Sequence, residues 1–110
     1  MRHYVEEWTP RPKWFQLSAE DRGKFFFDLA PTMQTLFDAG VELVGYVVNR
    51  HAGSPSGLSF LRIWKMPEES LAQRVEEALA ATAWHEFFEP GPSRGEVLTP
   101  QVAIPHLISP

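Results

Sequence analysis

The segment from Val41 to Asn49 constrains the fold more than any other part of this sequence. Its content of β-branched residues predicts a β-strand. Side chains alternate between the two faces of a sheet, and here both faces are apolar: Val41, Leu43 and Val47 on one, Val44, Tyr46 and Val48 on the other. Because a sheet with one face in water shows polar residues on that face, both faces need cover. A chain of 110 residues has too few other elements for this, so we expect a partner subunit to supply the second cover.

Three further strands are predicted around this segment. Residues 2–8 are aromatic and β-branched, and residues 58–66 form an antiparallel hairpin with 41–49 through the turn-rich loop at 52–57. A short fourth strand is predicted at 95–99, after the helix-ending run Pro-Gly-Pro at 90–92.

Two main helices are predicted between the strands. The first begins at the N-cap Ser18 and ends at Gly40, with a kink at Pro31, after a stiff extended connection at 10–13. The second begins at Pro67 and is followed by a short helical turn at 84–88. The apolar, proline-broken tail from Pro100 to Pro110 is expected to pack, with a dimer partner as one candidate surface, because a mobile tail is usually polar.

The order strand, helix, hairpin, helix, strand is that of the ferredoxin-like α+β fold, β-α-β-β-α-β with an antiparallel sheet. We therefore expect one domain over residues 1–110, in which 92–110 contain the fourth strand and the packed tail.

Four motifs extend this prediction to a family. They are His-Tyr-Val-Glu-x-Trp at 3–8, Trp-Phe-x-Leu-Ser-x-Glu-x-Arg at 14–22, Asp-Ala-Gly-Val-Glu-Leu-Val-Gly at 38–45 and Trp-x-Met-Pro at 64–67. In them the sequence resembles a small bacterial family of uncharacterised proteins of this length. The order of elements, with an open sheet face that a second copy would bury, resembles the dimeric α+β barrel superfamily. This resemblance implies a ferredoxin-like homodimer.

Composition excludes several classes of function. The net charge is −4 and the basic residues are scattered, which argues against nucleic acid as a partner. The absence of cysteine excludes disulfides, thiolate nucleophiles and cysteine-ligated metals. Since no apolar run is long enough to span a membrane, we expect a cytoplasmic protein without a membrane partner.

No motif for a metal, a nucleotide or a serine nucleophile is present. The histidines lack metal-ligand spacing, and neither a glycine-rich phosphate loop nor G-x-S-x-G occurs. We therefore expect no metal and no cofactor. The surplus of aromatic residues, eight Phe, four Trp and two Tyr, instead predicts a pocket for a small apolar or aromatic molecule.

Superfamily enzymes act in a pocket between the sheet and the helices, and the resemblance implies two sets of candidate residues there. The catalytic candidates are His3, Tyr46, Arg62 and His85, and the ligand-binding candidates are Asn49, Trp64, Trp84 and Phe88. Each has a structural alternative. Histidines in such positions are more often exposed residues at element ends, and tryptophans are more often part of the core or an interface. A buried Arg62 needs either an internal glutamate partner or an anionic ligand.

Three functions stay open. The first is a cofactor-independent enzyme of cyclase, isomerase or monooxygenase type, acting on an aromatic or enolisable substrate. The second is a non-catalytic ligand-binding or stress-associated dimer. The third is haem binding, because Asn49, Trp64 and His85 supply the residue types of an Asn, Trp, His set that resembles that of haem-degrading superfamily members.

Overall fold

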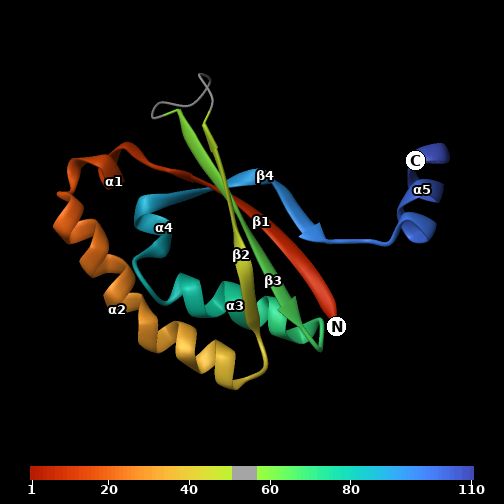
Figure 1. Cartoon of the computed structure of the whole chain (residues 1–110), viewed down its shortest axis with the longest axis horizontal. Helices are drawn as coiled ribbons and strands as arrows, with labels where there is room; N and C mark the ends of the chain where they lie inside the picture. Colours follow the sequence, from red (N-terminus) through yellow and green to blue (C-terminus); the bar gives the residue numbers. More distant parts are fainter. Residues whose placement is uncertain (51–56) are drawn as a thin grey trace.

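The computed structural model describes residues 1–50 and 57–110. Most of the predicted hairpin loop at 52–57 therefore lies outside the described residues. The elements follow one another along the chain as β1 (Arg2–Pro10), α1 (Pro12–Gln16), α2 (Ala19–Asp38), β2 (Glu42–Arg50), β3 (Leu58–Met66), α3 (Ser70–Ala80), α4 (Trp84–Phe87), β4 (Phe88–Glu96) and α5 (Pro100–Ile108) (Figure 1).

The four strands form one antiparallel sheet in the order β2-β3-β1-β4. This is the ferredoxin-like α+β fold, as the order of predicted elements indicated. Helices α2 and α3 pack on one face of the sheet, which we call the helix face. Residues directly opposite each other on paired strands share a face, so the register places Trp8 with Phe60 and Tyr4 with Trp64 on the helix face.

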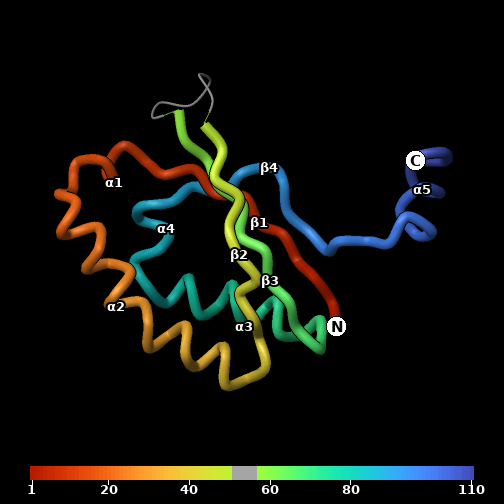
Figure 2. Tube along the Cα trace, viewed as in Figure 1, coloured from red at the N-terminus to blue at the C-terminus, as the bar shows by residue number. Residues whose placement is uncertain are grey.

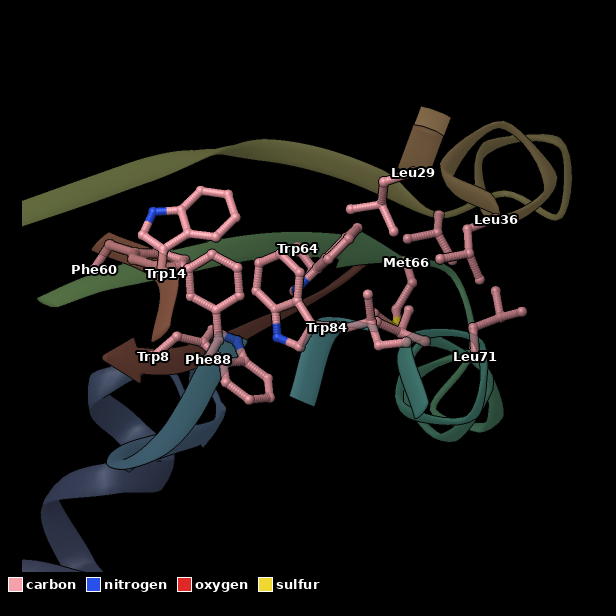
Figure 3. Close-up of a cluster of buried hydrophobic side chains, with 13 residues drawn as sticks. Trp8, Trp14, Leu29, Leu36, Phe60, Trp64, Met66, Leu71, Trp84 and Phe88 are labelled. Atoms are coloured by element: carbon pink, nitrogen blue, oxygen red, sulfur yellow. The ribbon is translucent and has the colours of Figure 1, made fainter. Parts of the chain in front are cut away.

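The core lies between the helix face and the helices and is rich in aromatic rings (Figure 3). Trp84 stacks on Phe88 with ring centroids 4.2 Å apart, and Trp14 meets Phe88 at 4.8 Å. Leu29 and Leu36 come from α2, and Leu71, Val75 and Leu79 come from one stripe of α3. These apolar stripes hold both helices against the sheet.

The predicted helix ends are partly confirmed. The hydroxyl of Ser18 accepts the backbone N–H of Asp21 at 3.1 Å, and Gly40 adopts a left-handed φ of 102° after α2. Helix α2 continues through Pro31. The predicted start of α3 at Pro67 is three residues early, and the connection at 10–13 is wrong, because Pro12 begins the short helix α1, where its missing N–H costs no helical bond.

The fourth strand is the largest correction. It begins at Phe88 and includes Pro90 and Pro92, which were predicted to end the preceding helical turn. Strand β4 is an edge strand, and an edge position tolerates residues that cannot donate to the ladder. The side chain of Glu7 fills the space beside Gly91, where an added Cβ would lie 2.7 Å from it.

A β-bulge corrects the predicted faces of β2. Leu43 lies opposite Trp64 and Gly45 opposite Ile63, so Val44 is the extra residue of the bulge. The alternation shifts there, and Leu43 shares the helix face with Tyr46 and Val48 rather than with Val47.

The other face of the sheet, which we call the outer face, carries apolar side chains that the helices do not cover. Val5, Leu61 and Ile63 are half-buried there, and Val47 is 41% exposed. The tail after β4 does not pack on its own chain, so the predicted packing would need a second copy. It leads away from the sheet to α5, which stands apart from the other elements (Figures 1 and 2).

Candidate functional site

The pairing of β1 with β3 places Glu6 directly opposite Arg62 in the centre of the helix face. Arg62 is fully buried and Glu6 is 7% exposed. The Nε of Arg62 donates to Glu6 Oε1 at 2.7 Å, and its Nη2 lies 2.6 Å from the same oxygen. The indole Nε1 of Trp64 donates to that oxygen at 2.6 Å. Of the two alternatives for Arg62, the structure therefore shows the internal glutamate partner.

Three tryptophans surround the guanidinium of Arg62. Its Cζ lies 4.1 Å from the ring centroid of Trp84, 5.1 Å from that of Trp64 and 5.7 Å from that of Trp8. Cation–π attraction and the ion pair with Glu6 together compensate the burial of this charge. The contacts from Arg62 hold the Glu6 carboxylate in one orientation.

Two adjoining cavities lie between the sheet and α3, with volumes of about 160 and 330 Å³. They share Glu6, Glu76 and Arg94. Glu76 and Arg94 are exposed and lie at the mouth, whereas Glu6 is buried and lies at the floor. We refer to the two together as the sheet–α3 cavity.

Aromatic side chains form much of its remaining wall. Tyr4 and Trp64 line the smaller part, and Trp8 and His85 line the larger part. The rings of Trp8 and His85 meet edge to face at 5.5 Å. The cavity thus combines apolar walls with two carboxylates, an imidazole and a guanidinium, and the Nη1 of Arg94 lies 3.9 Å from Glu76 Oε1 at the mouth.

Arg94 reaches this cavity because β4 bulges. Glu6 pairs with Arg94, but Trp8 pairs with Pro90, so β4 has extra residues opposite Glu7. The Nη2 of Arg94 donates to the carbonyl of Glu7 at 3.3 Å, and its Cζ lies 5.1 Å from the ring centroid of Trp8. Bulges near edge strands often redirect a side chain toward a site, and this bulge sets a cation beside an indole ring.

The indole N–H of Trp8 is a donor without an acceptor among the described residues. Trp8 is 3% exposed, its Nε1 is buried, and its side chain lines the larger part of the cavity. A buried donor without a partner costs about 1–3 kcal/mol. Such a group in a cavity wall is typical of a position where a ligand or an ordered water supplies the acceptor.

The structure separates the candidates that the sequence suggested. His3 and Asn49 lie on the outer face, and Tyr46 lies half-exposed at the sheet edge against Phe60. The core contains Arg62, Trp64, Trp84 and Phe88. Trp64 and His85 line the two parts of the cavity.

Sequence reasoning missed Glu6, Trp8 and Arg94. For the first two a signal exists: alternation along residues 2–8 puts Tyr4, Glu6 and Trp8 on one face, so the glutamate lies between aromatic side chains. For Arg94 there is none, because its position depends on a bulge in a strand interrupted by prolines and glycine.

In residues 1–50 and 57–110, no three His, Asp or Glu side chains gather as a metal site. No helix in the same part of the chain is both long and apolar enough to cross a membrane.

A family model described as a family of unknown function (DUF6616) matches residues 1–109. The chain belongs to the DUF6616 family. No curated protein matches its sequence. The predicted resemblance to a small uncharacterised family with a ferredoxin-like fold is thereby confirmed.

Solved structures agree with this fold at low identity. A protein assigned as a chlorite dismutase matches with a TM-score of 0.63 and 15% identity, over 86% of this DUF6616 chain and 42% of the other. The chlorite dismutase of Candidatus Nitrospira defluvii, solved with imidazole, gives a TM-score of 0.62 and 13% identity, over 90% and 40%. The DUF6616 chain therefore spans about two fifths of these chains.

A dimeric ferredoxin-like protein from an uncultured marine organism matches over nearly its whole length. It has a TM-score of 0.52 and 14% identity, over 90% of this chain and 96% of the other. These likenesses show the ferredoxin-like fold.

Proposed function

We propose that the sheet–α3 cavity binds a small aromatic or enolisable molecule that bears a carbonyl or carboxylate oxygen, and that the protein transfers a proton on it without a cofactor. The observation that carries this proposal is the unpartnered, buried indole N–H of Trp8, in one cavity with the Glu6 carboxylate and the Arg94 guanidinium. The aromatic wall suits the body of such a molecule.

Trp8 and Arg94 would hold the oxygen of the bound molecule. When a proton leaves the carbon beside a carbonyl, the electron pair moves onto that oxygen and gives it negative charge. Donors fixed in a water-poor site stabilise such a charge strongly. The guanidinium of Arg94 adds a positive charge, and the buried indole of Trp8 adds a donor that needs no reorientation.

Glu6 would accept the proton. The bonds from Arg62 and Trp64 all end on Oε1, which leaves Oε2 for a molecule in the cavity. His85, which also lines the larger part of the cavity, would return a proton at a second atom, which completes an isomerisation or a cyclisation. In this scheme His85 and Trp64 come from the predicted candidates, whereas His3, Tyr46 and Asn49 do not line the cavity and have no role.

Binding without turnover is the second candidate. It is favoured by the contacts of Glu6, whose Oε1 accepts hydrogen bonds from Arg62 and Trp64. Such contacts are also typical of a glutamate that only stabilises the fold. The two candidate functions share the same ligand. If the protein is an enzyme, Glu6→Gln abolishes turnover; if it only binds the ligand, there is no turnover for this substitution to change.

Haem is not favoured by the geometry. Asn49 is exposed on the outer face, and Trp64 is buried against Glu6, so Asn49, Trp64 and His85 do not converge. The larger part of the cavity, at about 330 Å³, lies near the lower end of the range for ordinary ligand sites, about 300–1,000 Å³. A porphyrin would have to displace the tryptophans around Arg62.

We also propose that two copies associate through their outer faces. The partly exposed Val5, Val47, Leu61 and Ile63 form a continuous apolar surface there, of the kind that marks an interaction site. The ferredoxin-like protein of similar length that shares this fold is described as dimeric, which supports association of two copies.

Arg94→Gln tests the ligand site. We expect benzoate, a minimal aromatic carboxylate, to bind about tenfold or more weakly to the variant, because a hydrogen bond to a charged group contributes about 1.5–3 kcal/mol. Benzyl alcohol, which has no charge, should lose much less affinity. Titration calorimetry measures both.

Arg74→Gln is the matched control, because Arg74 is an exposed arginine of α3 that does not line the cavity. Equal benzoate affinity in the two variants would contradict the role of Arg94 and with it the proposed site.

A further inference from the structure

The C-terminal arm, which we define as residues 97–110, has no cover in its own chain. Its first residue is bound to the sheet by a hydrogen bond from the Val97 N–H to the His3 carbonyl, at 2.8 Å. Beyond this point it leaves the body of the molecule, and α5 contains no buried residue (Figure 2). The radius of gyration is 15.5 Å, against about 13 Å for a compact domain of this length.

The composition of the arm is that of a buried segment. It contains no Lys, Arg, Asp or Glu, and His106 is its one titratable side chain. Leu107 is 78% exposed and Ile108 is 75% exposed. The other exposed apolar side chains of the arm are Val97, Leu98, Val102 and Ile104. A segment adapted to water would be charged or polar.

The hydrogen bonds within helix α5 are not enough to keep it folded in water. Isolated helices shorter than about 12–15 residues are marginal in water, and α5 has nine residues with Pro105 inside it. Packing on another surface is the usual source of stability for such a helix. The structure provides no such surface among the described residues of the same chain.

We infer that two copies of this chain exchange their C-terminal arms, so that each arm packs on the other copy. This inference rests on the proposed homodimer and adds a second contact to it. A second copy is the fitting occupant because exchange is reciprocal under two-fold symmetry, and both exposed arms are covered by one closed assembly.

The area supports this choice of occupant. Six apolar side chains exposed to this degree offer on the order of 300–400 Å², and a reciprocal exchange uses that area twice. A stable interface buries about 800 Å² per partner. The two arms with the outer face therefore reach the size that a stable dimer needs, whereas the outer face alone has few exposed apolar side chains.

A single label on the arm tests the inference. The chain has no cysteine, so Ser109→Cys gives one attachment point for a polarity-sensitive fluorophore beside the apolar residues of α5. Its emission should shift to the blue as protein concentration rises. The midpoint of this shift should fall at the same concentration as the midpoint of dimer formation measured by sedimentation. The same label on Gln73→Cys, an exposed position of α3, should show no such shift.

Removal of the arm should weaken the dimer. A chain that ends at Leu98 is expected to dissociate with a constant raised by roughly 100-fold or more. The double variant Leu107→Asp/Ile108→Asp should show the same direction of change. Gln101→Asp/Ser109→Asp adds the same charge to the arm without loss of apolar area and should have little effect.

Several outcomes overturn the inference. A blue shift that does not depend on concentration would show that the arm packs on its own chain, and one that appears only with lipid vesicles would show a membrane surface as its partner. An unchanged dissociation constant of the truncated chain would exclude a role in assembly. If the full chain stays monomeric while benzoate still binds, this inference fails and the cavity proposal stands. If the protein is a dimer with covered arms but binds no benzoate, the cavity proposal fails and this inference stands.

Discussion

Arg62→Met is expected to lower the free energy of unfolding by about 3–5 kcal/mol, the usual cost when one partner of a buried ion pair is removed. The variant would leave the Glu6 carboxylate in the core with Trp64 as its one remaining donor. It would also remove the guanidinium of Arg62 from the rings of Trp8, Trp64 and Trp84, of which Trp8 keeps the cation of Arg94. Urea denaturation monitored by tryptophan fluorescence measures the loss.

Two further variants show whether the loss of stability comes from the buried ion pair. Glu6→Gln combined with Arg62→Met should recover part of the loss, because no charge is then left unpaired and the glutamine oxygen can still accept from Trp64. Arg74→Met removes an exposed arginine and should change the unfolding free energy by less than about 0.5 kcal/mol. If Arg62→Met and Arg74→Met unfold at the same urea concentration, the buried pair is not what organises this core.

Val47→Asp is expected to raise the dimer dissociation constant by roughly 100-fold or more, because it places a charge within the proposed interface. Val47 lies opposite Leu61 on the outer face. It is 41% exposed on an edge strand, so the folded monomer can tolerate the change. Analytical ultracentrifugation over a range of concentrations measures the constant.

Val48→Asp is a closely matched control. Val48 is the next residue of the same strand and has the same side chain, but it lies opposite Phe60 on the helix face and is 61% exposed. Its substitution should leave the dimer nearly unchanged. Equal effects of the two substitutions would place the interface elsewhere than on the outer face.

Local sequence patterns predict most of this fold because they act over short distances. The N-cap at Ser18, the stop at Gly40 and the two-sided strand at 41–49 each depend on neighbouring residues, and these predictions locate α2 and β2. The order of elements then leaves few topologies, of which the ferredoxin-like one is observed.

The departures have identifiable physical causes. Residues 90–92 carry strong turn signals, yet they form part of β4, because an edge strand does not require every N–H. The bulge at Val44 reverses the face of Leu43, and its one local signal is the glycine that follows it in the strand, Gly45. The tail is apolar, as a packed segment should be, but the sequence does not say which molecule covers it.

The candidate site was harder to predict than the fold because its contacts are long-range. Glu6 and Arg62 are 56 residues apart and meet through strand register. The sequence left two candidate partners for Arg62, an internal glutamate and an anionic ligand. The register of β1 on β3 shows that the partner is Glu6. Arg94 and Trp8 meet across a bulged pair of strands that periodicity does not reveal.

The indole resonance of Trp8 tests the central claim most directly. Proton–nitrogen correlation spectra resolve the indole N–H groups, and Trp8→Phe and Trp14→Phe identify two of them. Trp14 is buried in the core but lines neither part of the cavity, so it is an internal reference. The proposed site predicts that benzoate moves the Trp8 resonance in a saturable way while that of Trp14 stays in place. A Trp8 resonance that does not respond, or one that moves only together with that of Trp14, would contradict it.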